Sequence, residues 1–292
     1  MTCDWNRVTL GRTGLSVSAL GLSVGGGGLP AHEIERAVER GINYLYFGSL
    51  RGCSMAQAVR TMAPRRDKLV LVVQSYTRVA GLLRTSLKRG LRALGTDHAD
   101  VLLLGWWSTP PPRAILDAAL EAQARGLAKH IMVSCHDRLM FAKYIPDTSY
   151  GAIMLRYNAS HPGAEREVFP LLQTEPEKRP GVVAYTATRW GDLVNPALTP
   201  EGERTPRGSD CYRFALTTPD VNVCLTAPAN ASQLDEAFAA LDRGPMDADE
   251  LAWMKRVGAS IRARRSQMSL PNPVHFVDRL IDRWTGGRSV EK

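Results

Sequence analysis

The sequence predicts an α/β protein in which eight parallel strands close into a (β/α)8, or TIM, barrel. Apolar β-type runs alternate with amphipathic helical stretches along almost the whole chain, and the strand segments are apolar on both faces. A length of 292 residues suits one such barrel, and 44% apolar with 23% charged residues supplies a large core. These proportions exclude a disordered chain.

The predicted elements follow one another as strand and helix pairs. Helix start signals agree with the periodicity, as where Pro110, Pro111 and Pro112 precede a helix that begins at Arg113. The strands are expected at residues 19–24, 42–46, 69–74, 100–105, 130–134, 152–156, 182–185 and 221–225. The helices are expected at residues 31–40, 55–62, 82–94, 113–125, 139–144, 164–172, 209–216 and 232–241.

The chain is predicted to form a single domain, 1–292. Its segment VTLGRTGLSVS indicates an N-terminal β-hairpin, 7–17, that covers the amino-terminal mouth of the barrel. The barrel proper is expected over 18–245, with a polar loop at 196–208. C-terminal helices and a tail follow over 246–292, where the residues beyond Ser266 are typical of an appended helix with a frayed end.

Composition limits the cellular setting. The five cysteines are scattered and form no C-x-x-C pair, which excludes a disulfide framework and a zinc ribbon and suits a reducing compartment. The first residues carry no apolar signal region, and the longest apolar run, at 99–107, is strand-sized. We therefore expect a cytoplasmic protein with no membrane partner.

The charge and histidine patterns favour neither nucleic acid nor metal. The net charge is +8, and its densest patch holds Lys255, Arg256, Arg262, Arg264 and Arg265 on one expected helix. Without helix-turn-helix spacing or interleaved aromatic residues, this patch is interpreted as a solvated helix face. The six histidines show no HExxH or paired spacing, so no metal is predicted.

In such a barrel the chemistry lies at the carboxyl ends of the strands, on the loops that follow them. The run from Gly25 to Gly28 lies there, but it lacks the Lys-Ser/Thr of a P-loop and the spacing of a dinucleotide fingerprint. It is interpreted as a flexible loop whose backbone can approach a ligand.

Several strings resemble the aldo-keto reductase family, in order and with similar spacing over roughly residues 7 to 242. LGRTGLSVSALGL is similar to that family's opening hairpin and first strand, and GINYLYFGSLRGCS to its GINFFDTA-x-x-YG-x-S segment. LKRGLRALGTDHADVLLLGWW, GLAKHIMVSCHD and GVVAYTATRWGDL each resemble a later segment of the family. The resemblance implies the same eight-stranded barrel.

The resemblance also implies that the family's four catalytic positions are all replaced. The family uses an Asp, a Tyr, a Lys and a His around a nicotinamide, with the Tyr giving a proton to the carbonyl oxygen. Carried over, the Asp place holds Tyr46, the Tyr place Arg51, the Lys place Gln74 and the His place Gly105. Because an arginine does not give up its proton, carbonyl reduction in the family's manner is not expected.

A remnant of the nicotinamide site is expected beside these replacements. Ser134, Asn158, Tyr185 and Gln233 stand where the resemblance places cofactor contacts. The basic residue that would bind a 2′-phosphate is absent, since Ala229 or Asn230 occupies its place. NADPH binding is therefore expected to be weak, and the cofactor stays unknown.

The rebuilt pocket suggests a different acid–base set. A guanidinium at Arg51 beside the phenol of Tyr46 would lower the phenol pKa, while Gln74 and His136 orient a substrate. The alternative is that Tyr46 packs in the core and Arg51 pairs with a surface carboxylate. Further pocket candidates from the strand ends are Tyr76, Trp106, Trp107, Cys135, Arg156 and Arg189.

Three functions stay open at this stage. The first is an enzyme repurposed for non-redox acid–base chemistry on a small molecule, such as elimination, cyclisation, isomerisation or hydrolysis. The second is an NADPH-dependent carbonyl reductase with a non-standard proton donor, and the third is a non-catalytic binding or scaffold protein. Fold alone decides between none of them.

Overall fold

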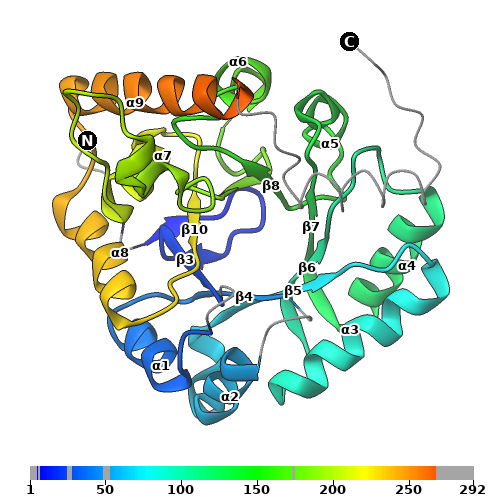
Figure 1. Cartoon of the computed structure of the whole chain (residues 1–292). Helices are drawn as coiled ribbons and strands as arrows, with labels where there is room; N and C mark the ends of the chain where they lie inside the picture. Colours follow the sequence, from blue (N-terminus) through cyan, green and yellow to red (C-terminus); the bar gives the residue numbers. More distant parts are fainter. Residues whose placement is uncertain (1–4, 6, 25–27, 49–52, 173–174, 268–292) are drawn as a thin grey trace.

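The computed structural model describes residues 5, 7–24, 28–48, 53–172 and 175–267. Within this part, eight parallel strands close into a barrel that helices surround (Figure 1), which confirms the predicted fold. The barrel order is β10-β3-β4-β5-β6-β7-β8-β9. Its strands are β3 (Leu20–Ser23), β4 (Tyr44–Gly48), β5 (Val70–Ser75), β6 (Ala99–Leu104), β7 (Ala128–Ser134), β8 (Ala152–Arg156), β9 (Gly181–Tyr185) and β10 (Val223–Thr226).

The period-two alternation of these strands builds two separate cores. Residues such as Val72, Val101 and Met132 point inward and fill the barrel, together with Tyr44. Their sequence neighbours point outward and pack against the helices in a larger cluster. Both faces are therefore buried, as the continuous apolar runs predict.

An antiparallel hairpin closes the amino-terminal end of the barrel. It consists of β1 (Val8–Thr9) and β2 (Ser16–Val17), and it places Leu10 and Val17 in the interior core. Gly11 bridges to Pro180, just before β9 begins. A Cβ atom on Gly11 would lie 2.2 Å from the backbone nitrogen of Gly181, so only glycine permits this approach. The predicted covering hairpin is confirmed.

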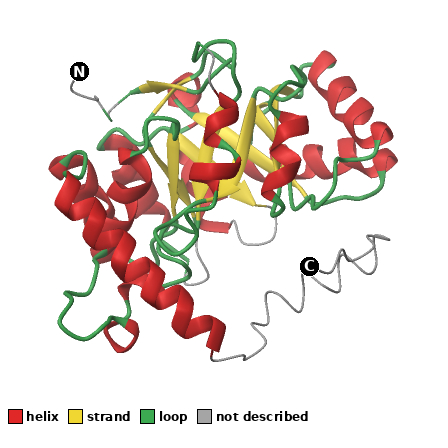
Figure 2. Ribbon diagram, turned by 90° about the horizontal axis from the view of Figure 1, so that it is seen from above, coloured by secondary structure: helices red, strands yellow, loops and turns green. Residues whose placement is uncertain are grey.

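The helices run on the outside of the barrel, where Figure 2 shows them around the strands. In chain order they are α1 (Ala31–Glu39), α2 (Cys53–Thr61), α3 (Ala80–Leu94), α4 (Arg113–Ala124), α5 (Phe141–Tyr144), α6 (Ala164–Glu167), α7 (Gly208–Thr217), α8 (Ala231–Arg243) and α9 (Ala248–Gln267). Short 3-10 helices lie at Ala63–Lys68, Arg138–Met140, Phe169–Leu172, Asp192–Val194 and Pro196–Leu198.

Two expected helices are shorter than the periodicity predicts. The helix expected at 164–172 ends at Glu167 and continues as a 3-10 turn, because Pro170 cannot donate the next helical hydrogen bond. The helix expected at 139–144 begins as a 3-10 turn whose N-cap, Asp137, accepts a hydrogen bond from the backbone of Leu139. The appended helix expected beyond Ser266 lies almost wholly outside the described residues.

The basic helix α9 packs on the barrel beside α6 and α7 (Figure 1). Gly258 allows the approach, since a Cβ atom there would lie 2.3 Å from the backbone of Ala159, and Ser160 donates a hydrogen bond to the Gly258 carbonyl at 2.9 Å. Among the described residues, no helix is both long enough and apolar enough to span a membrane.

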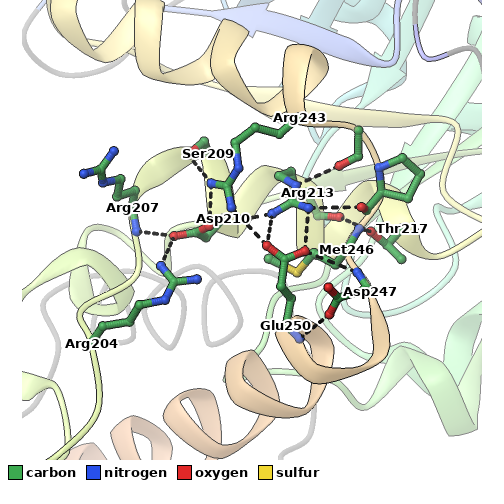
Figure 3. A network of polar contacts seen from close by, with 12 residues as sticks. Arg204, Arg207, Ser209, Asp210, Arg213, Thr217, Arg243, Met246, Asp247 and Glu250 are labelled. Carbon is green, nitrogen blue, oxygen red and sulfur yellow. Dashed lines mark hydrogen bonds and ion pairs between the residues drawn. The ribbon is translucent and has the colours of Figure 1, made fainter.

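Buried ion pairs join α9 to α7 and α8 (Figure 3). Asp210, whose side chain is fully buried, pairs with Arg243 at 2.8 Å and Arg204 at 3.1 Å. Arg213 holds both carboxylate oxygens of Glu250 at 2.6 Å. This pairing lowers the pKa of Glu250 to about 2, with the Arg213 hydrogen bonds as the main cause.

Candidate functional site

A cavity of about 650 Å³ lies at the carboxyl ends of the strands. Each of the eight barrel strands contributes one side chain to its wall, as the (β/α)8 architecture requires of a site at this end. These residues are Ser23, Tyr46, Gln74, Leu103, Ser134, Met154, Tyr185 and Leu225. Loops and helices add Val24, Trp106, Thr186, Ala187, Thr188, Trp190, Gly191, Val194, Gly208, Tyr212, Ala227, Gln233 and Glu236.

Tyr46 projects into this cavity from β4 and shares a hydrogen bond with Tyr76. Gly48 leaves room for the pair, because a Cβ atom there would lie 3.2 Å from the Tyr46 hydroxyl and 3.4 Å from the Tyr76 hydroxyl. Burial raises the pKa of Tyr46 well above its usual value, and the neighbouring Tyr76 raises it further. These surroundings therefore keep the phenol protonated at neutral pH.

This shift is opposite to the one that the Tyr46–Arg51 hypothesis needs. Arg51 lies outside the described residues, so this shift in the Tyr46 pKa includes no effect of the Arg51 guanidinium. The described neighbours of Tyr46 favour a hydrogen-bond donor rather than a phenolate.

Gln74 lies against Gly105 at the end of β5. A Cβ atom on Gly105 would lie 1.8 Å from Nε2 of Gln74, so the amide occupies the space that a larger residue at 105 would need. Gln74 is 2% exposed, and within the described residues its Oε1 has no hydrogen-bond partner. The cavity thus carries a buried acceptor that a ligand donor can satisfy.

The loop after β6 is fixed by Ser134. Its hydroxyl accepts a hydrogen bond from the Trp106 nitrogen at 2.9 Å, and its carbonyl accepts one from the Trp107 nitrogen at 3.0 Å. Trp106 adopts a left-handed φ of 59° and packs edge-on against Tyr76 with ring centroids 4.9 Å apart. Trp106 lines the cavity, whereas Trp107 is buried beneath the Arg78 guanidinium and is outside the lining.

The loop after β9 carries three more left-handed residues, at Thr186, Arg189 and Trp190, with φ values of 58°, 52° and 54°. Such backbone is costly for residues with a Cβ atom and is concentrated at functional sites. Thr186 and Trp190 line the cavity, but Arg189 is absent from its lining. Arg156 is absent too, and its guanidinium lies 5.5 Å from the centre of the Trp190 ring.

Two of the four expected nicotinamide contacts are engaged elsewhere. Asn158 is fully buried and outside the lining; its Nδ2 donates to the Thr186 carbonyl at 2.8 Å, and its Oδ1 accepts from the backbone of Ser160 and His161 at 3.0 Å. Gln233 lines the cavity while its Oε1 accepts a hydrogen bond from the Ala229 nitrogen at 2.9 Å. Ser134 and Tyr185 line the cavity, and their contact with a nicotinamide stays a prediction.

Two further candidates, Cys135 and His136, lie outside the cavity lining. Cys135 follows inward-pointing Ser134 and therefore points outward; it is 1% exposed and donates a hydrogen bond to the Asp137 carbonyl. Burial raises its pKa to about 12, which makes it a poor nucleophile. The His136 ring lies outside the lining, and its centroid is 6.5 Å from the centroid of the Tyr185 ring.

The charge of the described lining is unusual for a phosphate-binding site. It contains no lysine, arginine or histidine, and its carboxylate is Glu236, which receives hydrogen bonds from the Ser209 hydroxyl at 2.5 Å and nitrogen at 3.3 Å. Within the same residues, no group of three His, Cys, Asp or Glu side chains is placed to hold a metal ion.

The lining residues that were not among the sequence-based candidates include two large aromatic side chains. Trp190 lies in the segment after the seventh barrel strand. An aromatic residue next to Arg189 in this segment is a signal by which the sequence could have indicated it. Tyr212 comes from α7, beyond the Pro/Gly-rich loop, and the sequence gives no signal that this helix reaches the cavity.

Comparison with solved structures shows that the chain has the fold of aldo-keto reductases. An aldo-keto reductase from Bacillus halodurans in its holo form matches with a TM-score of 0.74 at 19% identity, over 86% of this chain and 95% of that chain. An aldo/keto reductase from Klebsiella pneumoniae in complex with NADP and acetate matches with a TM-score of 0.71 at 19% identity, over 85% and 94%. No family model and no curated protein matches the chain.

Proposed function

We propose that this chain is a divergent relative of the aldo-keto reductases that performs acid–base chemistry, without hydride transfer, on an uncharged small molecule. The observation that carries the proposal is the composition of the cavity wall: its described residues include neutral hydrogen-bonding groups and one carboxylate, Glu236, but no cation. A wall with one carboxylate and no cation suits an uncharged ligand and disfavours an anionic one.

A nicotinamide dinucleotide does not fit the residues present. Its diphosphate would find no positive partner in the described wall and would share the cavity with Glu236. Of the residues that the resemblance assigns to the nicotinamide, Asn158 has its amide bonded to neighbouring backbone groups and lies outside the wall. The reductase alternative is therefore the weaker proposal.

The chemistry centres on Tyr46. Because its pKa is raised, the phenol stays protonated and donates a hydrogen bond, which stabilises negative charge that develops on a substrate oxygen. Gln74 offers the complementary acceptor through its Oε1. A ligand with a carbonyl or hydroxyl oxygen and a nearby donor satisfies both groups at once.

A proton acceptor is available in Glu236, whose carboxylate belongs to the same cavity. A buried donor at one side and a carboxylate in the same wall are the components of enolisation, isomerisation or elimination next to a carbonyl group. The predicted role of His136, orienting the substrate, stays a prediction, as does the predicted place of Arg51 beside the Tyr46 phenol. The third alternative, a non-catalytic binding protein, differs by lacking any Tyr46-dependent turnover.

The test follows proton exchange. Small uncharged carbonyl compounds are incubated with the protein in D2O, and loss of their α-proton signals is measured by NMR. We expect protein-dependent exchange that falls at least ~10²-fold in Tyr46→Phe, the usual size of a lost acid–base group. Tyr150→Phe, a buried tyrosine outside the described wall, is the matched control. Equal rates in the two variants would contradict the proposal.

A further inference from the structure

Arginines that do not line the cavity come from several elements and lie near His161 and Arg189. They come from the 3-10 turn Arg138–Met140, the end of β8, the loop after β9 and helix α9, and five of them interact electrostatically with His161 or Arg189. We call these residues the arginine cluster: Arg138, Arg156, Arg189, Arg262 and Arg265.

Two members of the arginine cluster have carboxylate partners. Arg138 holds Glu167 at 2.5 and 3.3 Å, and Arg265 holds both oxygens of Asp192. Arg189 has a weaker contact with a carboxylate: its Nε lies 3.8 Å from Asp192, which Arg265 already binds. Within the described residues, Arg156 and Arg262 have no carboxylate partner.

Arg189 is the least satisfied of the group. Its side chain is 12% exposed, and its Nε and Nη1 are buried without a hydrogen-bond partner in the described residues. A buried guanidinium without partners is strongly unfavourable, and its backbone adds the cost of a left-handed φ of 52°. An anion bound beside Arg189 would accept hydrogen bonds from these buried N–H groups.

Burial, together with the nearby arginines, keeps His161 neutral at neutral pH. Burial lowers the pKa of His161 to about 3, and Arg156, Arg189, Arg262 and Arg138 lower it as well. The ring therefore does not compete with the arginines for an anion at neutral pH, and its Nδ1 lies 3.3 Å from Oδ1 of Asn158.

We propose that the arginine cluster binds an oxyanion, a carboxylate or phosphate group, with Arg189 and Arg156 as its main ligands. The position of Trp190 links this site to the cavity, because Trp190 lines the cavity wall while Arg156 lies 5.5 Å from the centre of its ring. Because Arg156 and Arg189 lie outside the cavity lining, this oxyanion is distinct from the uncharged molecule that the proposed function places in the cavity.

The test is a calorimetric titration of the full chain with inorganic phosphate, and separately with acetate, against chloride at constant ionic strength. We expect saturable binding of at least one anion in the millimolar range. Arg189→Met should weaken it at least tenfold and Arg156→Met about threefold or more, whereas Arg89→Met, an exposed arginine on α3, should change nothing. Arg156 is partly exposed, so its variant keeps the test valid if Arg189→Met fails to fold.

Two results would overturn the site: no saturable binding of either anion, or an equal loss in Arg89→Met. Neither result bears on proton exchange in the cavity, which depends on Tyr46. Conversely, tight NADPH binding that Arg189→Met weakens would overturn the proposed non-redox function and leave the anion site standing.

Discussion

Two arginine-rich regions of this molecule differ in how their charges are met. Between α7, α8 and α9, Arg204, Arg213 and Arg243 surround Asp210 and Glu250 at hydrogen-bonding distances (Figure 3). In the arginine cluster, Glu167 pairs with Arg138 and Asp192 pairs with Arg265. Arg189 lies 3.8 Å from Asp192, and Arg156 and Arg262 have no carboxylate partner among the described residues. The difference separates arginines that hold helices together from arginines that are available to a ligand.

The largest expected effect comes from comparing one arginine of each region. Arg213→Met leaves the Glu250 carboxylate without its main partner and removes a 3.9 Å contact with the buried Asp210, so we expect the free energy of unfolding to fall by about 3–5 kcal/mol. Arg189→Met removes a poorly satisfied buried charge and should cost less than about 1 kcal/mol. Urea unfolding measures both, and a similar large loss in the two variants would show that Arg189 is structural.

A second prediction concerns Gln74, whose Oε1 is also buried without a hydrogen-bond partner among the described residues. Gly105→Ala forces a Cβ atom against the Gln74 amide and should lower the free energy of unfolding by about 1–3 kcal/mol. Gln74→Ala alone opens space at this position, and combining the two changes should restore most of the loss. Thermal unfolding of the two single variants and the double variant tests this, and strictly additive losses would count against the packing described here.

A third, smaller effect appears in the pH dependence of stability. The unfolded chain binds a proton at His161 near its usual pKa of 6.5, whereas the folded protein does so only at about 3, so stability falls as pH drops below 6.5. One proton accounts for at most about 1.4 kcal/mol per pH unit. His161→Asn should reduce the slope between pH 6.5 and 4.5, with a remainder from His130, whose pKa burial also lowers.

Below pH 4.5 the ion-pair region adds its own contribution. The pKa of Glu250 is lowered from 4.5 to about 2, so the stability that it provides is present above pH 4.5 and is lost as pH falls toward 2. Glu250→Gln should therefore flatten the curve only in this lower range. A His161→Asn variant with an unchanged slope at pH 5–6 would contradict the neutral histidine in the arginine cluster.

The sequence predicted the scaffold and the inward-pointing strand residues better than the loops. The apolar runs predict the strands of the barrel. The two-residue period of a strand then places four polar side chains in the cavity wall: Tyr46, Gln74, Ser134 and Tyr185. The period also places Cys135 on the outer face, one residue beyond Ser134.

Beyond the strand ends the period no longer applies. The left-handed turns at Trp106, Arg189 and Trp190 decide which side chains enter the cavity, and nothing in these residue types demands such backbone. The pairing of Asp210 with Arg243, and of Arg213 with Glu250, joins residues more than thirty positions apart, which local patterns cannot reveal. Arg189 was expected to contact a substrate because it follows the end of a strand. In the structure it lies outside the cavity wall.

The most direct test of the account is an NADPH titration of the purified chain, followed by calorimetry and by nicotinamide fluorescence. The described part of the cavity wall has one carboxylate and no cation, which predicts a Kd no tighter than about 100 μM, or roughly −5.5 kcal/mol. A Kd in the micromolar range or tighter would contradict it and make the chain a reductase with an unusual proton donor.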